Sequence, residues 1–271
     1  MQTDDTLISY NLLKQRIIDR GFCTLCGACE AACPTTALHI EKNQVVRLHD
    51  CSQDLVLCPI CYELCPHSER LLLRALHFIS DAPKKDDALG YYRTVILAQA
   101  ANPKLHGKSR GGGVAAALIE YGVGKQLFDS TIYSQDKTNN HVNVLTSAEY
   151  FEDDVLASFR TDLFTSSVAK AYGKAVFEYK KRKIAYVGLP CHTLALRKME
   201  AWQHKFSNNL AISIGLFCFG ALSYTSLLAY ITKKTGIQAS EIVNMRLSSD
   251  LIVQTADREI RLPISEVEDY L

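Results

Sequence analysis

The sequence predicts an α/β fold (α+β overall) in which a small cysteine-rich segment precedes a larger domain with a largely parallel sheet. Eight of the ten cysteines fall between Cys23 and Cys65. Beyond residue 93, short apolar stretches alternate with amphipathic stretches, a pattern typical of strands and helices in parallel sheets. We therefore expect a segment at 1–80, a polar linker containing Pro and Gly at 81–92, and a domain at 93–271.

The composition is that of an ordinary globular protein, with 48% hydrophobic residues and a net charge of +1. This charge gives no sign of a nucleic-acid or anionic-membrane partner. Residues 1–11 lack the features of a secretory signal, and the most apolar stretch, 211–222, is too short to cross a bilayer. We expect a cytoplasmic protein that meets a membrane only through a partner. In that reducing compartment, ten cysteines predict metal ligation rather than disulfides.

The eight cysteines form an internal repeat. The first copy has the spacing C-x2-C-x2-C-x3-C-P and begins at Cys23, and the second has C-x6-C-x2-C-x3-C-P and begins at Cys51. In such repeats three thiolates hold one cubane and the fourth cysteine turns towards the other cluster. The spacing therefore predicts two [4Fe–4S] clusters. Cluster one would take Cys23, Cys26, Cys29 and Cys65, and cluster two would take Cys33, Cys51, Cys58 and Cys61.

Zinc is the main alternative, because zinc sites also use C-x2-C pairs. Zinc leaves the third cysteine of each triad and the repeated Cys-Pro unexplained, so the spacing favours iron–sulfur. Cys51 is the weakest member, since its interval of six residues departs from the bacterial pattern. Without Cys51 the second cluster would hold three irons or borrow another ligand. From Gly21 to Leu72 the segment resembles a two-cluster bacterial ferredoxin, which relays single electrons, and apolar spacing predicts flanking helices at 7–20 and 68–80.

In the larger domain we expect strands at 93–99, 130–133, 183–188 and 210–217, and helices at 114–126, 168–181, 193–205 and 224–234. Ligands of parallel sheets bind where a strand leads into a helix. One such place is a glycine-rich turn, Lys108-Ser109-Arg110-Gly111-Gly112-Gly113. Its glycines permit close backbone approach, and its two basic residues favour a phosphate. The turn lacks the Walker and G-x-G-x-x-G spacings, so a flexible turn is an equally good interpretation.

Two further junctions carry cysteines. Cys191 lies in Gly188-Leu-Pro-Cys-His192 after one expected strand, and Cys218 follows the next strand. The carboxyl ends of parallel strands meet at one edge, so these thiols would face a single site. Two ordinary buried thiols are an equally good interpretation. His192 is open between a metal ligand, a cofactor neighbour and a structural imidazole.

The order of these motifs is similar to that of a known family. The cysteine segment, the turn at 109–113, VGLPCHTLALRK and IGLFCFG resemble the coenzyme F420 hydrogenase/dehydrogenase beta-subunit family over nearly the whole chain. The family includes beta subunits of F420-reducing hydrogenase and formate dehydrogenase, and the input subunit of F420H2 dehydrogenases. The resemblance implies an FAD-containing α/β domain that exchanges a hydride with the deazaflavin coenzyme F420, its substrate.

The resemblance also implies site residues. Cys191 and Cys218 would supply two of four ligands to a third [4Fe–4S] cluster. The family continues into a C-x2-C pair that completes this cluster, so we expect the chain to be C-terminally truncated relative to the family. The residues expected to bind the flavin or its coenzyme partner are Lys108, Ser109, Arg110, Gly111, Gly112, Gly113, Arg160, Thr161, Pro190 and His192.

The expected function is that of an iron–sulfur flavoprotein oxidoreductase of anaerobic, methanogenic archaea. FAD takes a hydride from F420 and releases electrons singly, as cubane clusters require. The sequence reveals no catalytic acid or base. The expected partner is a hydrogenase, a formate dehydrogenase, a heterodisulfide or sulfite reductase, or a respiratory complex, and either direction of electron flow is open. A flavin-free electron-transfer or scaffold subunit is the first alternative, and a relative acting on another substrate, such as a chlorophyll-derivative reductase, is the second.

Overall fold

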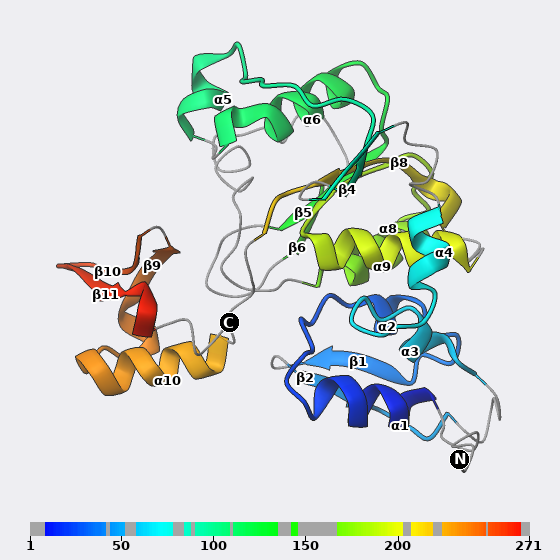
Figure 1. Cartoon of the computed structure of the whole chain (residues 1–271), viewed down its shortest axis with the longest axis horizontal. Helices are drawn as coiled ribbons and strands as arrows, with labels where there is room; N and C mark the ends of the chain where they lie inside the picture. Colours follow the sequence, from blue (N-terminus) through cyan, green and yellow to red (C-terminus); the bar gives the residue numbers. More distant parts are fainter. Residues whose placement is uncertain are drawn as a thin grey trace.

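The computed structural model describes most of the chain and divides it into three parts (Figure 1). These are the cysteine segment, a central part built on a sheet, and a C-terminal unit. The described residues are 9–41, 44–51, 58–77, 84–87, 90–108, 111–134, 142–145, 167–202, 207–218, 224–247 and 249–266. In those ranges no helix combines the length and the apolar character that a membrane crossing requires.

The cysteine segment consists of short elements. Helix α1 (Ser9–Leu13) runs on into a π-helical turn, η1 (Lys14–Ile18), which confirms most of the predicted first helix. The cysteine loops lead into α2 (Ala28–Ala31) and α3 (Ile60–Glu63), and β1 (Leu38–Glu41) pairs antiparallel with β2 (Gln44–Arg47). The helix expected at 68–80 is observed as α4 (Leu72–His77).

The expected linker contains a small hairpin. Strand β3 (Lys84–Asp86) pairs antiparallel with β4 (Gly90–Tyr92), so that each lysine lies opposite a tyrosine. The ammonium groups of Lys84 and Lys85 lie 5.9 and 5.6 Å from the facing ring centroids, a cation–π arrangement that a polar composition alone does not reveal. The strand expected at 93–99 was wrong. Residues 94–100 have no regular structure, and no described strand pairs with them.

A four-stranded sheet forms the central part. Its elements are β5 (Ser130–Ser134), β6 (Val142–Leu145), β7 (Ile184–Gly188) and β8 (Leu210–Gly215), in the order β6-β5-β7-β8. β5, β7 and β8 run parallel, which confirms the predicted parallel sheet for three strands, whereas β6 is an antiparallel edge. β7 is buried along its whole length, as expected of a strand covered on both faces.

Helices cover both faces of this sheet. Helices α8 (Val168–Phe177) and α9 (Pro190–Ala201) pack against one face, through Ile132, Ile184 and Tyr186. Helices α5 (Pro103–Lys108) and α6 (Val114–Gly124), joined by the turn η2 (Gly111–Gly113), lie with the opposite face, which carries Tyr133, Ala185 and Val187. The alternation of side chains along β7 explains why neighbouring residues belong to different cores. The 3-10 turn η4 (Ser207–Asn209) leads into β8.

The C-terminal unit has a core of its own and lies apart in Figure 1. Its elements are α10 (Tyr224–Thr235), η5 (Ala239–Glu241), β9 (Ile242–Leu247), β10 (Asp250–Thr255), β11 (Glu259–Pro263) and η6 (Ile264–Glu266). The three strands form an antiparallel sheet in the order β11-β10-β9. Apolar residues of α10 pack on this sheet, so the larger domain is less uniformly parallel than the sequence predicts.

The cysteine segment shares a hydrophobic core with the central part. Cys26, Ala28 and Leu64 pack in the same cluster as residues of α8, β7 and α9. Glycines allow this close approach, because a Cβ atom on Gly27 would lie 2.7 Å from the Cβ of Lys170. The Ala169 amide also donates a hydrogen bond to the carbonyl oxygen of Cys26 at 3.0 Å. The two parts are therefore tightly packed on each other.

Candidate metal centres

The structure gathers the four cysteines that the spacing assigns to cluster one. Three come from the loop before α2 and from α2 itself, and Cys65 comes from the loop after α3. The thiol of Cys26 interacts electrostatically with Cys65 and Cys29, and that of Cys29 with Cys23 and Cys65. Residues 42 positions apart thus meet at one place, and their ligation of iron stays a prediction.

The cysteines assigned to cluster two form a second group. The thiol of Cys61 interacts with those of Cys58, Cys33 and Cys51. Cys51 itself interacts with Cys33 and Cys58, so the longer interval still places its side chain with the other three. Cys29 also interacts with Cys61, which links the two groups.

The choice between a cubane and a single metal ion at these groups stays a prediction. In the part of the chain that the structure describes, no three histidine, cysteine, aspartate or glutamate side chains lie close enough to hold one metal ion. A zinc ion needs four ligands within about 2.3 Å of one centre. A cubane instead spreads its thiolates over different irons. All ten cysteines are free thiols in the structure, so none is committed to a disulfide.

Burial changes the acidity of these thiols. It raises the pKa of Cys61 to about 12 and that of Cys65 to about 11. Burial also raises the pKa of Cys26 and Cys29 well above the ordinary value. Since iron binds the thiolate, metal uptake must release these protons and compensate for burying the charge.

Hydrogen bonds to sulfur surround the second group. The Ser9 hydroxyl lies 3.1 Å from the Cys61 sulfur and accepts the Tyr62 amide at 3.0 Å, and the Ala37 amide donates to the Cys33 sulfur at 3.2 Å. Hydrogen bonds to cluster sulfurs are among the features that set reduction potential. Sequence reasoning missed Ser9, because it lies 52 residues from its sulfur partner in the chain.

The remaining two cysteines lie at the carboxyl edge of the parallel sheet. Cys191 opens α9 directly after β7, and Cys218 follows the neighbouring strand β8. The two thiols interact electrostatically, and Cys191 also interacts with Cys26 of the first group. A hydrogen bond from the Thr24 side chain reaches Cys191. The pair therefore lies beside the first group.

Buried hydroxyl groups lie on β7, α9 and β8, the elements next to this pair. Among the described residues, the hydroxyl oxygens of Tyr186, Thr193 and Ser213 are buried and have no hydrogen-bond partner. The Tyr186 hydroxyl interacts electrostatically with Cys26 and Cys191, and burial raises its pKa well above the ordinary value. A buried donor without an acceptor costs about 1–3 kcal/mol. Cluster sulfur would supply that acceptor, so the residues at this edge fit an iron–sulfur group.

Pro190 and His192 have local structural roles. Pro190 occupies the first position of α9, where its fixed φ suits a helix start. The His192 ring is buried, and its Nδ1 atom accepts the Leu189 amide at 3.1 Å, which caps the same helix end. Contact of these two residues with a cofactor stays a prediction.

The glycine-rich turn is explained in large part by its own backbone. Gly112 and Gly113 have φ angles of 71° and 72°, in the left-handed region that favours glycine. A Cβ atom on Gly113 would lie 2.7 Å from the Leu105 carbonyl oxygen. The Lys108 side chain and residues Ser109, Arg110, Arg160 and Thr161 lie outside the described residues. Their expected role in flavin binding therefore stays a prediction.

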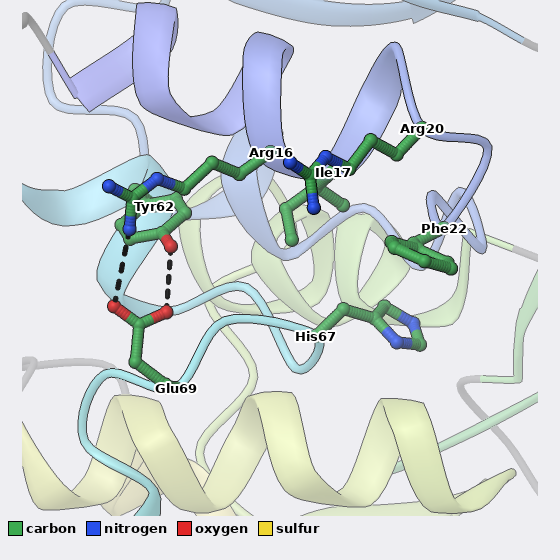
Figure 2. A pocket seen from close by; sticks show the side chains of 7 residues that line it. All are labelled: Arg16, Ile17, Arg20, Phe22, Tyr62, His67 and Glu69. Carbon is green, nitrogen blue, oxygen red and sulfur yellow. Dashed lines mark hydrogen bonds and ion pairs between the residues drawn. The ribbon is translucent and has the colours of Figure 1, made fainter.

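A depression of about 450 Å³ opens on the cysteine segment (Figure 2). One oxygen of Glu69 accepts the Tyr62 hydroxyl at 2.7 Å, and the other pairs with Arg16 at 3.8 Å. These contacts tie η1 to the loop that follows Cys65. The lining residues are Arg16, Ile17, Arg20, Phe22, Tyr62, His67 and Glu69.

Two family models match the chain. Residues 181–271 match the model for the C-terminal part of the coenzyme F420 hydrogenase/dehydrogenase beta subunit. Residues 16–39 match that of a 4Fe–4S binding domain. The first match contains Cys191 and Cys218, and the second contains Cys23, Cys26, Cys29 and Cys33.

Individual relatives agree with these matches. An F(420)H(2) dehydrogenase component from Methanosarcina mazei is 26% identical over 94% of this chain and 70% of that protein. The beta subunit of coenzyme F420 hydrogenase from Methanococcus voltae is 27% identical over 57% of this chain and 55% of that protein. The chain thus spans between about half and seven tenths of the length of these relatives.

A solved structure has the same fold over much of the chain. It is a chain of the F420-reducing [NiFe] hydrogenase complex from Methanosarcina barkeri, in a xenon derivative. The two agree with a TM-score of 0.59 at 22% identity, over 69% of this chain and 66% of that one.

Proposed function

Because the chain belongs to the coenzyme F420 hydrogenase/dehydrogenase beta-subunit family, we propose that it is an electron-transferring oxidoreductase subunit. It would exchange a hydride between coenzyme F420 and FAD, and pass single electrons through two [4Fe–4S] clusters to or from a partner redox subunit. The partner would be a hydrogenase, a dehydrogenase or a sulfite reductase, as the names of the relatives suggest.

The observation that carries this proposal is the order of the cysteine groups. The Cys191–Cys218 pair lies beside the first group through Cys26, and the first group lies beside the second through Cys29 and Cys61. A row of this kind leads from the carboxyl edge of the parallel sheet, where ligands of such sheets bind, to the outer cysteine segment. It supports a path for single electrons in either direction.

The residues of the chain would hold and insulate this path. When bound, FAD supplies hydride chemistry and the clusters carry electrons one at a time. The two cysteine groups would ligate the clusters, and the Tyr186 hydroxyl would donate a hydrogen bond to sulfur. The shared core around Cys26, Leu64 and Leu196 would exclude water from the region between the first group and the sheet.

Anaerobic purification of the full chain tests the proposal. We expect about eight irons per chain from the two clusters. We further expect flavin absorption bands that bleach on addition of reduced coenzyme F420, followed by reduction of the clusters. Flavin-loaded chain whose bands do not respond to the reduced coenzyme would contradict the hydride step.

A flavin-free electron-transfer subunit is the second candidate. It is favoured by the glycine turn, where local backbone geometry already accounts for Gly112 and Gly113. A cluster spectrum with no flavin, even after incubation with FAD, would support this candidate and exclude the first.

A further inference from the structure

Helix α9 carries a buried lysine that faces the cysteine segment. The Lys198 side chain has no exposed surface, although lysine is among the residues least often found fully buried. Its ammonium group reaches from the central part to the loop after α3, and lies 2.6 Å from the Cys65 carbonyl oxygen. Lys198 therefore contacts the backbone of a cysteine assigned to cluster one.

Three oxygen atoms surround the Nζ atom of Lys198. Its Nζ atom also lies 2.8 Å from the Ser68 carbonyl oxygen and 3.1 Å from the Ser68 hydroxyl oxygen. That hydroxyl also donates to the Cys65 carbonyl oxygen at 3.0 Å. The three N–H groups of an ammonium ion match the three oxygen atoms around Nζ, so the surroundings suit the charged form of Lys198.

No described carboxylate forms an ion pair with this ammonium group. Burial lowers the pKa of Lys198 and the charge of Glu69 opposes this shift, but the Glu69 carboxylate itself binds Tyr62 and Arg16. Cys65 and Cys26 are the other charged partners of Lys198 when ionised. Lys170 is a useful contrast, because it also bridges the two parts but pairs with Glu30 at 2.9 Å. The charge of Lys198 therefore acts mainly on the first cysteine group.

We propose that Lys198 is a positioning residue of cluster one, which fixes the Cys65 loop and raises the reduction potential of that cluster. The inference rests on the proposed function, since it requires cluster one to be present. Reduction adds one electron from the donor to [4Fe–4S]²⁺ and gives [4Fe–4S]⁺, so the ligated cluster becomes more negative by one unit. A nearby cation in a buried, weakly screened site stabilises that added charge.

The reduction potential of cluster one would therefore also depend on the packing of α9 against the cysteine segment. Lys198 and Cys191 belong to the same helix, and the ammonium group reaches cluster one only when α9 packs against the cysteine segment. The same contact that places the Cys191–Cys218 pair beside the first group therefore also tunes that group.

Potentiometric titration followed by electron paramagnetic resonance tests the inference on the full, cluster-loaded chain. In Lys198→Met and Lys198→Gln, we expect the equilibrium constant for reduction of cluster one to fall at least tenfold, which is about 59 mV for a one-electron couple. Cluster two, in the same molecule, should change less than threefold because it lies farther from Lys198.

Two control variants separate charge from structure. Ser68→Ala removes one acceptor but keeps the ammonium charge, and Lys174→Met removes an exposed lysine of α8. Both should leave the potential of cluster one within threefold of the wild type. A shift in Ser68→Ala as large as in Lys198→Met would contradict a charge effect.

The outcomes distinguish this inference from the proposed function. Wild-type chain that forms no cluster one would contradict the proposed function. Neutral Lys198 variants that form cluster one with an unchanged potential would overturn the inference alone. If neither neutral variant forms cluster one, Lys198→Arg decides, because it keeps the charge and changes the shape. Its potential should stay within threefold, and a tenfold fall would overturn the inference.

Discussion

The cysteine segment and the C-terminal unit are stabilised in opposite ways. The cysteine segment builds part of its core from Cys29, Cys61 and Cys65, and it packs closely on α8 and α9. The C-terminal unit closes a core of its own between α10 and its sheet. The position of the candidate clusters thus depends on the central part, whereas the C-terminal unit has the means to fold independently of them.

The largest loss of stability should follow from adding a methyl group at Gly27, where the cysteine segment packs on α8. In Gly27→Ala the new Cβ would meet backbone and Cβ atoms of Lys170, at a residue whose φ is 86°. Left-handed backbone and overpacking together should lower the free energy of unfolding by about 4 kcal/mol. Fluorescence of Trp202, the single tryptophan, reports on the shared core during urea unfolding.

Gly236→Ala is the matched control in the other region. Its φ is 78°, but a Cβ atom there would have no neighbour within 4 Å. Only the backbone penalty of about 1–2 kcal/mol is expected, confined to the C-terminal unit. Equal losses in the two variants would contradict close packing at Gly27.

Truncating a buried side chain in each core also compares the cysteine segment with the C-terminal unit. Met199→Ala in the shared core and Leu251→Ala in the C-terminal core each remove a fully buried side chain and should cost about 3 kcal/mol. Peptide-resolved hydrogen exchange should show faster opening of both α9 and the cysteine segment in Met199→Ala. In Leu251→Ala, exchange should rise only in the C-terminal unit, and a change in the cysteine segment would argue against its independence.

A smaller, pH-dependent effect should be confined to the cysteine segment. Burial raises the pKa of Cys61 from 9.0 to about 12, so the folded metal-free chain keeps this thiol protonated while the unfolded chain ionises. The contribution of the Cys61 thiol to the free energy of unfolding is complete below pH 9 and is lost as the pH rises towards 12. From pH 8 to 10 the free energy of unfolding should fall by about 1.4 kcal/mol from this group. Urea unfolding should show a shallower fall in Cys61→Ser, and identical slopes would contradict the account.

The grouping of the eight cysteines was predictable from a repeated spacing, and their ligation of iron stays a prediction. C-x2-C-x2-C brings three thiolates to one corner within a few residues, and the reciprocal fourth cysteine follows from the repeat. The parallel strands β5, β7 and β8 were predictable from short apolar runs between amphipathic helices. In these cases a local pattern of residues carries the signal, even where the partners lie far apart in the chain.

Features that depend on distant partners could not be predicted. An apolar run at 93–99 predicts a strand, yet strand formation also needs a pairing partner, and none is described. Nothing in the sequence around Gly27 indicates that Lys170 packs against it. Lys198 offers one faint signal, since it lies seven residues after Cys191 and so on a similar face of α9. The acceptors that hold it lie 130 or more residues away.

The most direct test of the central claim is the iron content and reduced-state spectrum of the full chain beside Cys65→Ser and Cys33→Ser. We expect about eight irons in the wild type and two reducible cubanes. Cys65→Ser should lose or convert cluster one and retain cluster two, and Cys33→Ser should do the reverse. Simultaneous loss of both clusters in each variant, or wild-type chain with tightly bound zinc and no reducible iron, would contradict the division into two groups of four.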